Sequence, residues 1–287
     1  MKKIKWLFIF IVFNVVIFTG CSNNDPASSS YMVRSAGLGE TALPLAHKEF
    51  AFEIFNDKIT TLDIISVNRV KDGPEEYEDT YITSGKVSVR DRFYGVNFRL
   101  GYGNYTEIKL GLFQGSIFEI GRRFNVVDES NNLITLYQER YTPIKGAHLG
   151  LKRLLTHQTN PHKISLYLEG KRIITDTPSY AFIYDGRNLE FKSALIYGYL
   201  KNISSRNFPS LAIYHSIANT ERKNSVSGIS KKKHPQAIGG EVNLNLAYGM
   251  VYANISTGIE KEISYKSTDK IKPYWGIKFG LHFKTHE

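Results

Sequence analysis

The sequence predicts an all-β fold, an antiparallel transmembrane β-barrel of about 10 to 12 strands that follows a signal peptide and a flexible tether. Apolar and polar residues alternate with a period of two along much of the 287-residue chain. The 17 Phe, 18 Tyr and 2 Trp make it rich in aromatic residues, although its mean hydropathy of -0.26 is slightly negative. Barrel strands contact lipid only at every second residue, so this composition suits a barrel better than a helical membrane protein.

The chain begins with a segment that is typical of a secretory signal peptide. Lys2, Lys3 and Lys5 precede residues 6–18, which are apolar with one exception. As a helix this run would be roughly 20 Å long at ~1.5 Å per residue. The hydrocarbon core of a bilayer is about 30 Å thick, so the run is too short for a comfortable transmembrane helix. The pattern therefore indicates a signal peptide over residues 1–20.

The signal peptide is followed by Cys21, the only cysteine of the sequence. The segment Ile17-Phe18-Thr19-Gly20-Cys21 resembles the bacterial lipobox, in which a small residue precedes an obligatory cysteine. This resemblance implies transfer of diacylglycerol to the Cys21 sulfur, cleavage before Cys21 and acylation of the new amino terminus. A thiol is a good nucleophile for such an alkylation. Several acyl chains anchor a protein far more firmly than one. By the same resemblance, Ser22 favours the outer membrane of a double-membraned bacterium. An ordinary signal peptide with an incidental cysteine is the alternative.

The barrel domain is predicted to span residues 45–287, after the lipidated cysteine and a tether over residues 21–44. Apolar residues at every second position mark its strands, and small, charged or other polar residues occupy the alternate positions. The apolar sets are Phe50, Phe52 and Ile54; Tyr94, Val96, Phe98, Leu100 and Tyr102; Ile108, Leu110 and Leu112; Ile164, Leu166 and Leu168; Leu189, Phe191, Leu195, Tyr197 and Tyr199; Val242, Leu244, Leu246 and Tyr248; and Trp275, Ile277, Phe279, Leu281 and Phe283. Residues 103–104 offer a tight hairpin turn, and residues 148–157 fit a short helix.

Glycine and charge on the second face distinguish a barrel from a sandwich. In the last predicted strand, Gly276, Lys278, Gly280 and His282 alternate with the apolar set. A barrel in lipid turns its apolar face outward and packs small or polar residues in the lumen. This final strand also resembles the insertion signal of bacterial outer-membrane barrels. Aromatic residues near strand ends are predicted to form interface girdles, namely Tyr94, Tyr102, Tyr105, Tyr197, Tyr199, Tyr248, Tyr252, Tyr274 and Trp275.

Two segments early in the chain are similar to bacterial lipoprotein barrels. They are RSAGLGETALPLAHKEFAFEIF over residues 34–55 and FYGVNFRLGYGNYTEIKLGLF over residues 93–113. Those proteins have small residues and a Leu-Gly-x-Gly/Glu motif before the first strand, and then a hairpin of the Y-G-…-E-I-x-L-G-L type. The resemblance supports the fold and implies little about activity.

Charged residues on the predicted inner faces are the candidates for a function of the lumen. These candidates are Arg99, Glu107, Lys109, Glu190, Lys192, Lys278 and His282. One interpretation is that they pair across strands and close the barrel. The other is that they line a narrow aqueous pore and set its selectivity. The sequence leaves both interpretations open.

The charge balance points to an anionic surface as a partner. The formal net charge is +10, and removal of the three lysines of residues 1–20 leaves +7. Membrane lipid and lipopolysaccharide are the expected partners of an exported lipoprotein, and nucleic acid is not. A segment over residues 221–235 contains the basic residues Arg222, Lys223, Lys231, Lys232 and Lys233, and residues 72–79 form an acidic loop. The alternative is that both are ordinary solvated loops.

No arrangement of residues predicts an enzyme. His215 and Ser216 are adjacent on a predicted strand, so their side chains point to opposite faces and cannot cooperate as in a catalytic triad. The histidines lack zinc-site spacing, and residues 37–40 (GLGE) lack the Lys-Ser/Thr of a phosphate loop, so no metal or cofactor is expected. The expected function is that of a lipid-anchored outer-membrane barrel, structural or a narrow pore for small polar solutes. A soluble, lipid-tethered β-sandwich binding module and a barrel lipid hydrolase are the alternatives.

Overall fold

The computed structural model describes residues 37–64, 86–103, 105–127, 133–175, 186–200, 207–223, 230–234, 236–263 and 271–284. The lipobox and the acidic segment over residues 72–79 lie outside the described residues. Every regular element of the described chain is a β-strand. None of the described residues belongs to a helix that is long and apolar enough to cross a bilayer.

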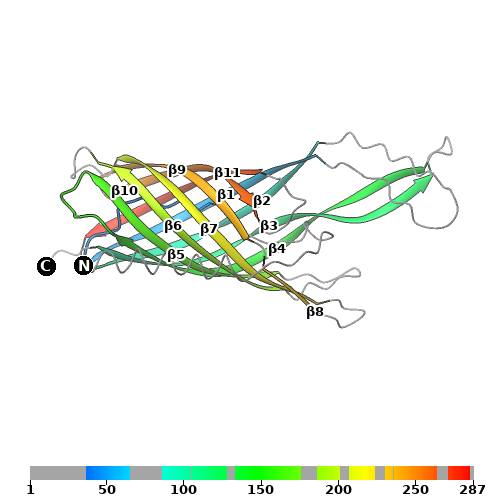
Figure 1. Ribbon diagram of the computed structural model, residues 1–287, viewed down its shortest axis with the longest axis horizontal. Helices are drawn as coiled ribbons and strands as arrows, with labels where there is room; N and C mark the ends of the chain where they lie inside the picture. Colours follow the sequence, from blue (N-terminus) through cyan, green and yellow to red (C-terminus); the bar gives the residue numbers. More distant parts are fainter. Residues whose placement is uncertain are drawn as a thin grey trace.

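The strands form one closed antiparallel ring (Figure 1). They are β1 (Glu49–Ile64), β2 (Lys86–Tyr102), β3 (Thr106–Val127), β4 (Leu133–Leu154), β5 (His162–Thr175), β6 (Gly186–Tyr199), β7 (Phe208–Lys223), β8 (Ser230–Lys233), β9 (Gln236–Tyr248), β10 (Val251–Glu262) and β11 (Ile271–Lys284). Strand β1 pairs with β11, and this pairing closes the ring. Strands β8 and β9 pair with successive parts of β7 and act as one interrupted strand, so the ring has ten positions. The prediction of an all-β barrel is confirmed, at the lower end of the expected strand count.

The two ends of the barrel differ in the average length of their connections. At one end, here the short-turn end, strands are joined by residues 103–105, 155–161, 200–207 and 249–250. At the other, the long-connection end, they are joined by residues 65–85, 128–132, 176–185, 224–229 and 263–270. The β3–β4 hairpin also extends past the other strands at this end (Figure 1). In barrels of the bacterial outer membrane, the end with short turns is periplasmic and the end with longer loops is external.

The outer surface of the ring is apolar, as the alternation predicts. Ile213 is 70% exposed, Leu112 63% and Leu149 55%, and the inward residues that alternate with them are largely buried. A β-sandwich would bury such side chains between two sheets, so that alternative is wrong. A closed ring with an apolar exterior suits a bilayer, because it leaves no open sheet edge and presents hydrocarbon to lipid.

Two of the predicted girdle residues point into the lumen instead. Tyr252 is 8% exposed and Tyr274 is 4% exposed. The Tyr252 hydroxyl donates to the Glu53 carboxylate at 2.7 Å, and the Tyr274 hydroxyl donates to the Glu241 carboxylate at 3.0 Å. A tyrosine near a strand end can therefore serve a buried carboxylate as well as a membrane interface.

Two stretches that were expected to be helix or loop are β-strand. Residues 148–157 form no helix, because β4 continues to Leu154. In the basic segment, β7 continues to Lys223 and pairs with β8, with Arg222 opposite Lys231. The five basic residues therefore lie on a hairpin extension at the long-connection end.

Residues 37–48, here called the strap, run inside the barrel before β1. Leu38, Glu40 and Ala42 are 6%, 0% and 0% exposed. The strap ends at the short-turn end, where Lys48 has a positive φ of 61° and the chain reverses into β1. The barrel thus encloses its own N-terminal segment.

Candidate functional site in the lumen

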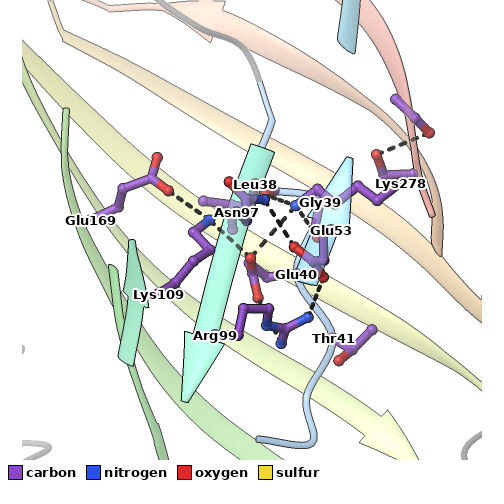
Figure 2. Close-up of polar contacts among 12 residues, drawn as sticks. Leu38, Gly39, Glu40, Thr41, Glu53, Asn97, Arg99, Lys109, Glu169 and Lys278 are labelled. Carbon is purple, nitrogen blue, oxygen red and sulfur yellow. Dashed lines mark hydrogen bonds and ion pairs between the residues drawn. The ribbon is translucent and has the colours of Figure 1, made fainter. Parts of the chain in front are cut away.

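Glu40 is the charged centre of the lumen (Figure 2). The Nζ atoms of Lys109 and Lys152 each lie 2.9 Å from its carboxylate, and Lys278 Nζ and Arg99 Nη2 each lie 3.5 Å away. A buried carboxylate is unfavourable by several kcal/mol unless charges and hydrogen bonds compensate for its lost hydration. Four cations from β2, β3, β4 and β11 supply that compensation, so the strap carboxylate joins strands from different parts of the ring.

The wall around Glu40 carries further carboxylates that compensate the repulsion between these cations. Arg99 and Lys109 lie opposite each other on β2 and β3, an unfavourable pairing of like charges. Arg99 contacts the carboxylates of Glu53 and Glu107, both at 2.6 Å, and Lys109 Nζ lies 2.8 Å from Glu169. Alternating signs therefore stabilise a cluster that would repel itself if it were made of the cations alone.

The strap backbone is bound by wall side chains in place of a neighbouring strand. The amides of Leu38 and Gly39 donate to the two oxygens of the Glu241 carboxylate at 2.6 and 2.7 Å. Lys278 Nζ donates to the carbonyls of the same two residues at 3.2 and 2.6 Å. Buried backbone groups need such partners, and each charge-assisted bond contributes about 1.5–3 kcal/mol.

Small residues on the inner face make room for the strap. A Cβ atom at Gly198 would lie 2.9 Å from the Ala42 Cβ. At Gly101, the Ala46 carbonyl of the strap occupies the space that a side chain would need. Gly101 and Gly198 on the inner face therefore have a structural reason, which is the close approach of a second chain segment. Gly111 and Gly280 instead make room for the wall side chains of His148 and Tyr252.

A second, apolar layer lies beyond the charged one. It consists of Phe55, Phe93, Phe113, Ile144 and Ile173, all less than one-tenth exposed and packed in one cluster. Each lies further along its strand toward the long-connection end than the residue of that strand that belongs to the cluster around Glu40, as Phe55 lies beyond Glu53 and Phe113 beyond Lys109. The inner faces of β1 to β5 therefore carry an apolar layer beyond the charged one, where the alternation predicted a polar inner face throughout. On β10, in contrast, the inner face stays polar toward the long-connection end, because Glu260 is buried there and accepts a hydrogen bond from the Tyr214 hydroxyl.

The predicted lumen candidates lie in three places. Arg99, Glu107, Lys109 and Lys278 belong to the cluster around Glu40. Glu190 and Lys192 lie together on β6, with 3.6 Å between carboxylate and Nζ, and Lys192 also donates to the Gly37 carbonyl at 2.7 Å. His282 Nε2 lies 3.1 Å from the Glu49 carboxylate near the short-turn end.

The strap and several of its partners are not among the lumen residues predicted from the sequence. Glu169 and Glu241 share the inward parity of predicted strands, so the alternation itself could have identified them. Glu40 carries no such signal, because it lies in an irregular segment that was assigned to the tether. Lys152 is absent from the predicted inward-facing residues because residues 148–157 fit a short helix by sequence.

The adjacent pair His215 and Ser216 takes opposite faces of β7. Ser216 and Tyr214 are buried on the inner face. His215 lies opposite Ile238, which is exposed on the outer face, and its Nε2 is 3.1 Å from the Gln236 side chain. This geometry does not bring the imidazole to the hydroxyl.

Comparison with known proteins gives similarity of fold. No protein-family model and no curated protein matches the chain. The translocator domain of the autotransporter NalP from Neisseria meningitidis is 9% identical, with 83% of this chain and 90% of that chain covered and a TM-score of 0.41. The β domain of the Bordetella autotransporter Brka (9%, 83% and 100%, TM-score 0.36) and LpxR from Salmonella typhimurium (9%, 83% and 100%, TM-score 0.34) are similar at the same level. At these identities the similarity concerns the fold alone.

Proposed function

We propose that the protein is a lipid-anchored outer-membrane β-barrel with a structural role, whose lumen is closed at rest by its own strap. The observation that carries the proposal is the position of Glu40, which is fully buried among four cations of the wall. An open pore for polar solutes needs a continuous aqueous path. In this barrel the strap occupies the charged layer, and Phe and Ile side chains pack in the next layer.

Planar-bilayer recording tests the closed state. The purified full-length protein should give no steps of ion current, whereas a variant that lacks residues 1–46 should give steps or brief openings. Heat-modifiable migration on a detergent gel verifies that both proteins are folded. Steady ion current through the full-length protein would show an open pore and contradict the proposal.

The outer membrane is the proposed location, because a closed barrel with an apolar exterior is the spanning structure of that membrane. Cys21 is the proposed site of acylation, on the basis of its lipobox-like context. Cells grown with labelled palmitate should incorporate the label into the wild-type protein and not into Cys21→Ser. Incorporation into the variant would place any acyl chain elsewhere.

Lipopolysaccharide is the proposed partner of the β7–β8 hairpin. Five basic residues, Arg222, Lys223, Lys231, Lys232 and Lys233, lie along its two strands at the long-connection end. Clustered cations attract anionic lipid head groups by about 1 kcal/mol each near a surface. Replacement of all five by Gln should reduce the lipopolysaccharide that copurifies with the barrel; an unchanged amount would exclude this role for the hairpin.

A further inference from the structure

The direction in which the strap runs along the barrel follows from the positions of its contacts on the strands. Near its C-terminal end, the Leu45 amide donates to Glu107 at 2.7 Å, and Glu107 is the second residue of β3. Ser165 Oγ donates to the Ala42 carbonyl at 2.5 Å, and Ser165 is the fourth residue of β5. Both strands begin at the short-turn end, so this part of the strap lies close to that end.

Further toward the N-terminus, the contacts move along the strands. The Gly37 amide donates to the Tyr214 hydroxyl at 3.1 Å, and Tyr214 is the seventh residue of β7, which also begins at the short-turn end. The Gly37 carbonyl accepts from Lys192, which lies seven residues before the end of β6 at Tyr199. From Leu45 to Gly37, the strap therefore advances toward the long-connection end.

At the level of Glu40, the route back toward the short-turn end is filled. Leu38, Glu40 and Ala42 are almost completely buried, and Lys152 beside them is 1% exposed. A returning chain would have to separate the ion pairs of Glu40 or replace the inner side chains that surround it. At Gly37, in contrast, the chain is partly exposed. It is bound there by Tyr214 of β7 and Lys192 of β6, and not by β1 to β5, which carry the apolar layer.

We infer that the polypeptide N-terminal to Gly37 leaves the barrel at the long-connection end, so that it is presented on the outside of the cell. An acyl anchor on Cys21 would then insert into the outer leaflet. The inference rests on the outer-membrane location proposed above but is independent of acylation. On this inference, the lumen is the passage through which the N-terminal segment reaches the outside.

The chain is long enough for this path. From the level of Tyr214 to the end of β7 at Lys223 is about 30 Å at ~3.3 Å per strand residue. Residues 21–36 can span roughly 50 Å when extended at ~3.3 Å per residue. Cys21 can therefore reach past the end of the barrel wall without any change in the strap.

Labelling of single added cysteines on intact cells tests the inference. Ser29→Cys reports on the N-terminal segment, Asn131→Cys on the β3–β4 connection at the long-connection end, and Thr159→Cys on the short-turn end. The wild-type chain gives the background from Cys21. Each variant is treated with a membrane-impermeant maleimide before and after permeabilisation of the outer membrane, and its heat-modifiable migration verifies folding.

We expect Ser29→Cys to react on intact cells to the same extent as Asn131→Cys, while Thr159→Cys reacts only after permeabilisation. Labelling of Ser29→Cys only after permeabilisation, together with Thr159→Cys, would overturn the inference, as would a failure to label in both conditions. If Asn131→Cys also fails on intact cells, the proposed membrane location is at fault, so the two failures are distinguishable. Asp25→Cys serves as a second position in the same segment and should behave as Ser29→Cys does.

Discussion

The charged cluster around Glu40 and the apolar layer on β1 to β5 stabilise the same barrel by different physical means. Around Glu40, closure depends on ion pairs and hydrogen bonds between the strap and the wall. Around Phe113, stability depends on side-chain packing, in a cluster that includes Phe55 and Ile173 of the wall and reaches Leu38 and Ala42 of the strap. Loss of one partner in a buried ion cluster leaves uncompensated charge, whereas loss of a packed ring leaves a cavity. The first layer should therefore control where the strap lies, and the second should control how stable the wall is.

The largest expected effect is that of Glu40→Lys, which would place a fifth cation among four. Breaking a buried ion pair costs about 3–5 kcal/mol, and charge reversal adds repulsion, so we expect the strap to leave the charged layer. Maleimide labelling of Ala42→Cys, in a Cys21→Ser background, measures whether the strap has left. The cysteine at position 42 should be protected from the reagent when residue 40 is Glu and should react in the Glu40→Lys variant. Glu40→Gln is the matched control of the same shape and should give intermediate reactivity. Full protection in Glu40→Lys would show that the ion cluster does not hold the strap.

Phe113→Ala should affect stability and leave the strap in place. Removal of a buried phenylalanine ring costs about 3–5 kcal/mol in packed interiors, and Phe113 is 5% exposed. Urea titration of the barrel in detergent should show a lower unfolding midpoint, with Ala42→Cys still protected below that midpoint. Exposure of Ala42→Cys in the folded variant would mean that the two layers are coupled and not separate.

Gly198→Ala tests how closely the strap fits the wall. The added methyl group would lie 2.9 Å from the Ala42 Cβ, and overpacking of this kind costs about 1–3 kcal/mol. We expect a moderate increase in labelling at a cysteine replacing Ala42, smaller than that in Glu40→Lys. Gly170→Ala is a suitable control, because its nearest described neighbour is 3.6 Å away.

Tyr248→Ala should have the smallest effect and provides the baseline. Its side chain is 91% exposed on the outer face near the short-turn end. Exposed substitutions that remove no buried contact usually change stability by less than about 0.5 kcal/mol. The unfolding midpoint and the protection of Ala42→Cys should both match the wild type; a marked change in either would assign this residue an unexpected contact.

The wall of the barrel could be predicted from sequence because alternation is a local signal. The set from Trp275 to Phe283 gives the outward face of β11, and Lys278 and Gly280 give its inward face. Parity would also have placed Tyr274 inside, since it shares the phase of Lys278, but its aromatic character suggested an interface. Position within the period was therefore the better guide than residue type.

The strap could not be predicted in the same way. Its residues have no periodicity, and its hydrogen bonds go to side chains that are distant in sequence, such as Glu241 for Gly39. The glycines on the inner face were a signal that something must approach closely, but they did not say what. Only the closed ring shows that Gly101 and Gly198 face a second segment of the same chain.

The most direct test of the central claim is a disulfide between the strap and the wall. In a Cys21→Ser background, Ala42→Cys combined with Gly198→Cys would place two sulfurs on Cβ atoms that lie 2.9 Å apart before any adjustment. A small shift of the strap away from β6 brings them to the separation of about 3.5–4.5 Å that disulfides adopt. Ala42→Cys with Tyr248→Cys is the control, since Tyr248 points out of the ring. Mass spectrometry of the folded, heat-modifiable protein should find the peptides of residues 42 and 198 joined in the first variant and not in the second. A folded first variant with two free thiols under oxidising conditions would show that the strap does not lie in the lumen.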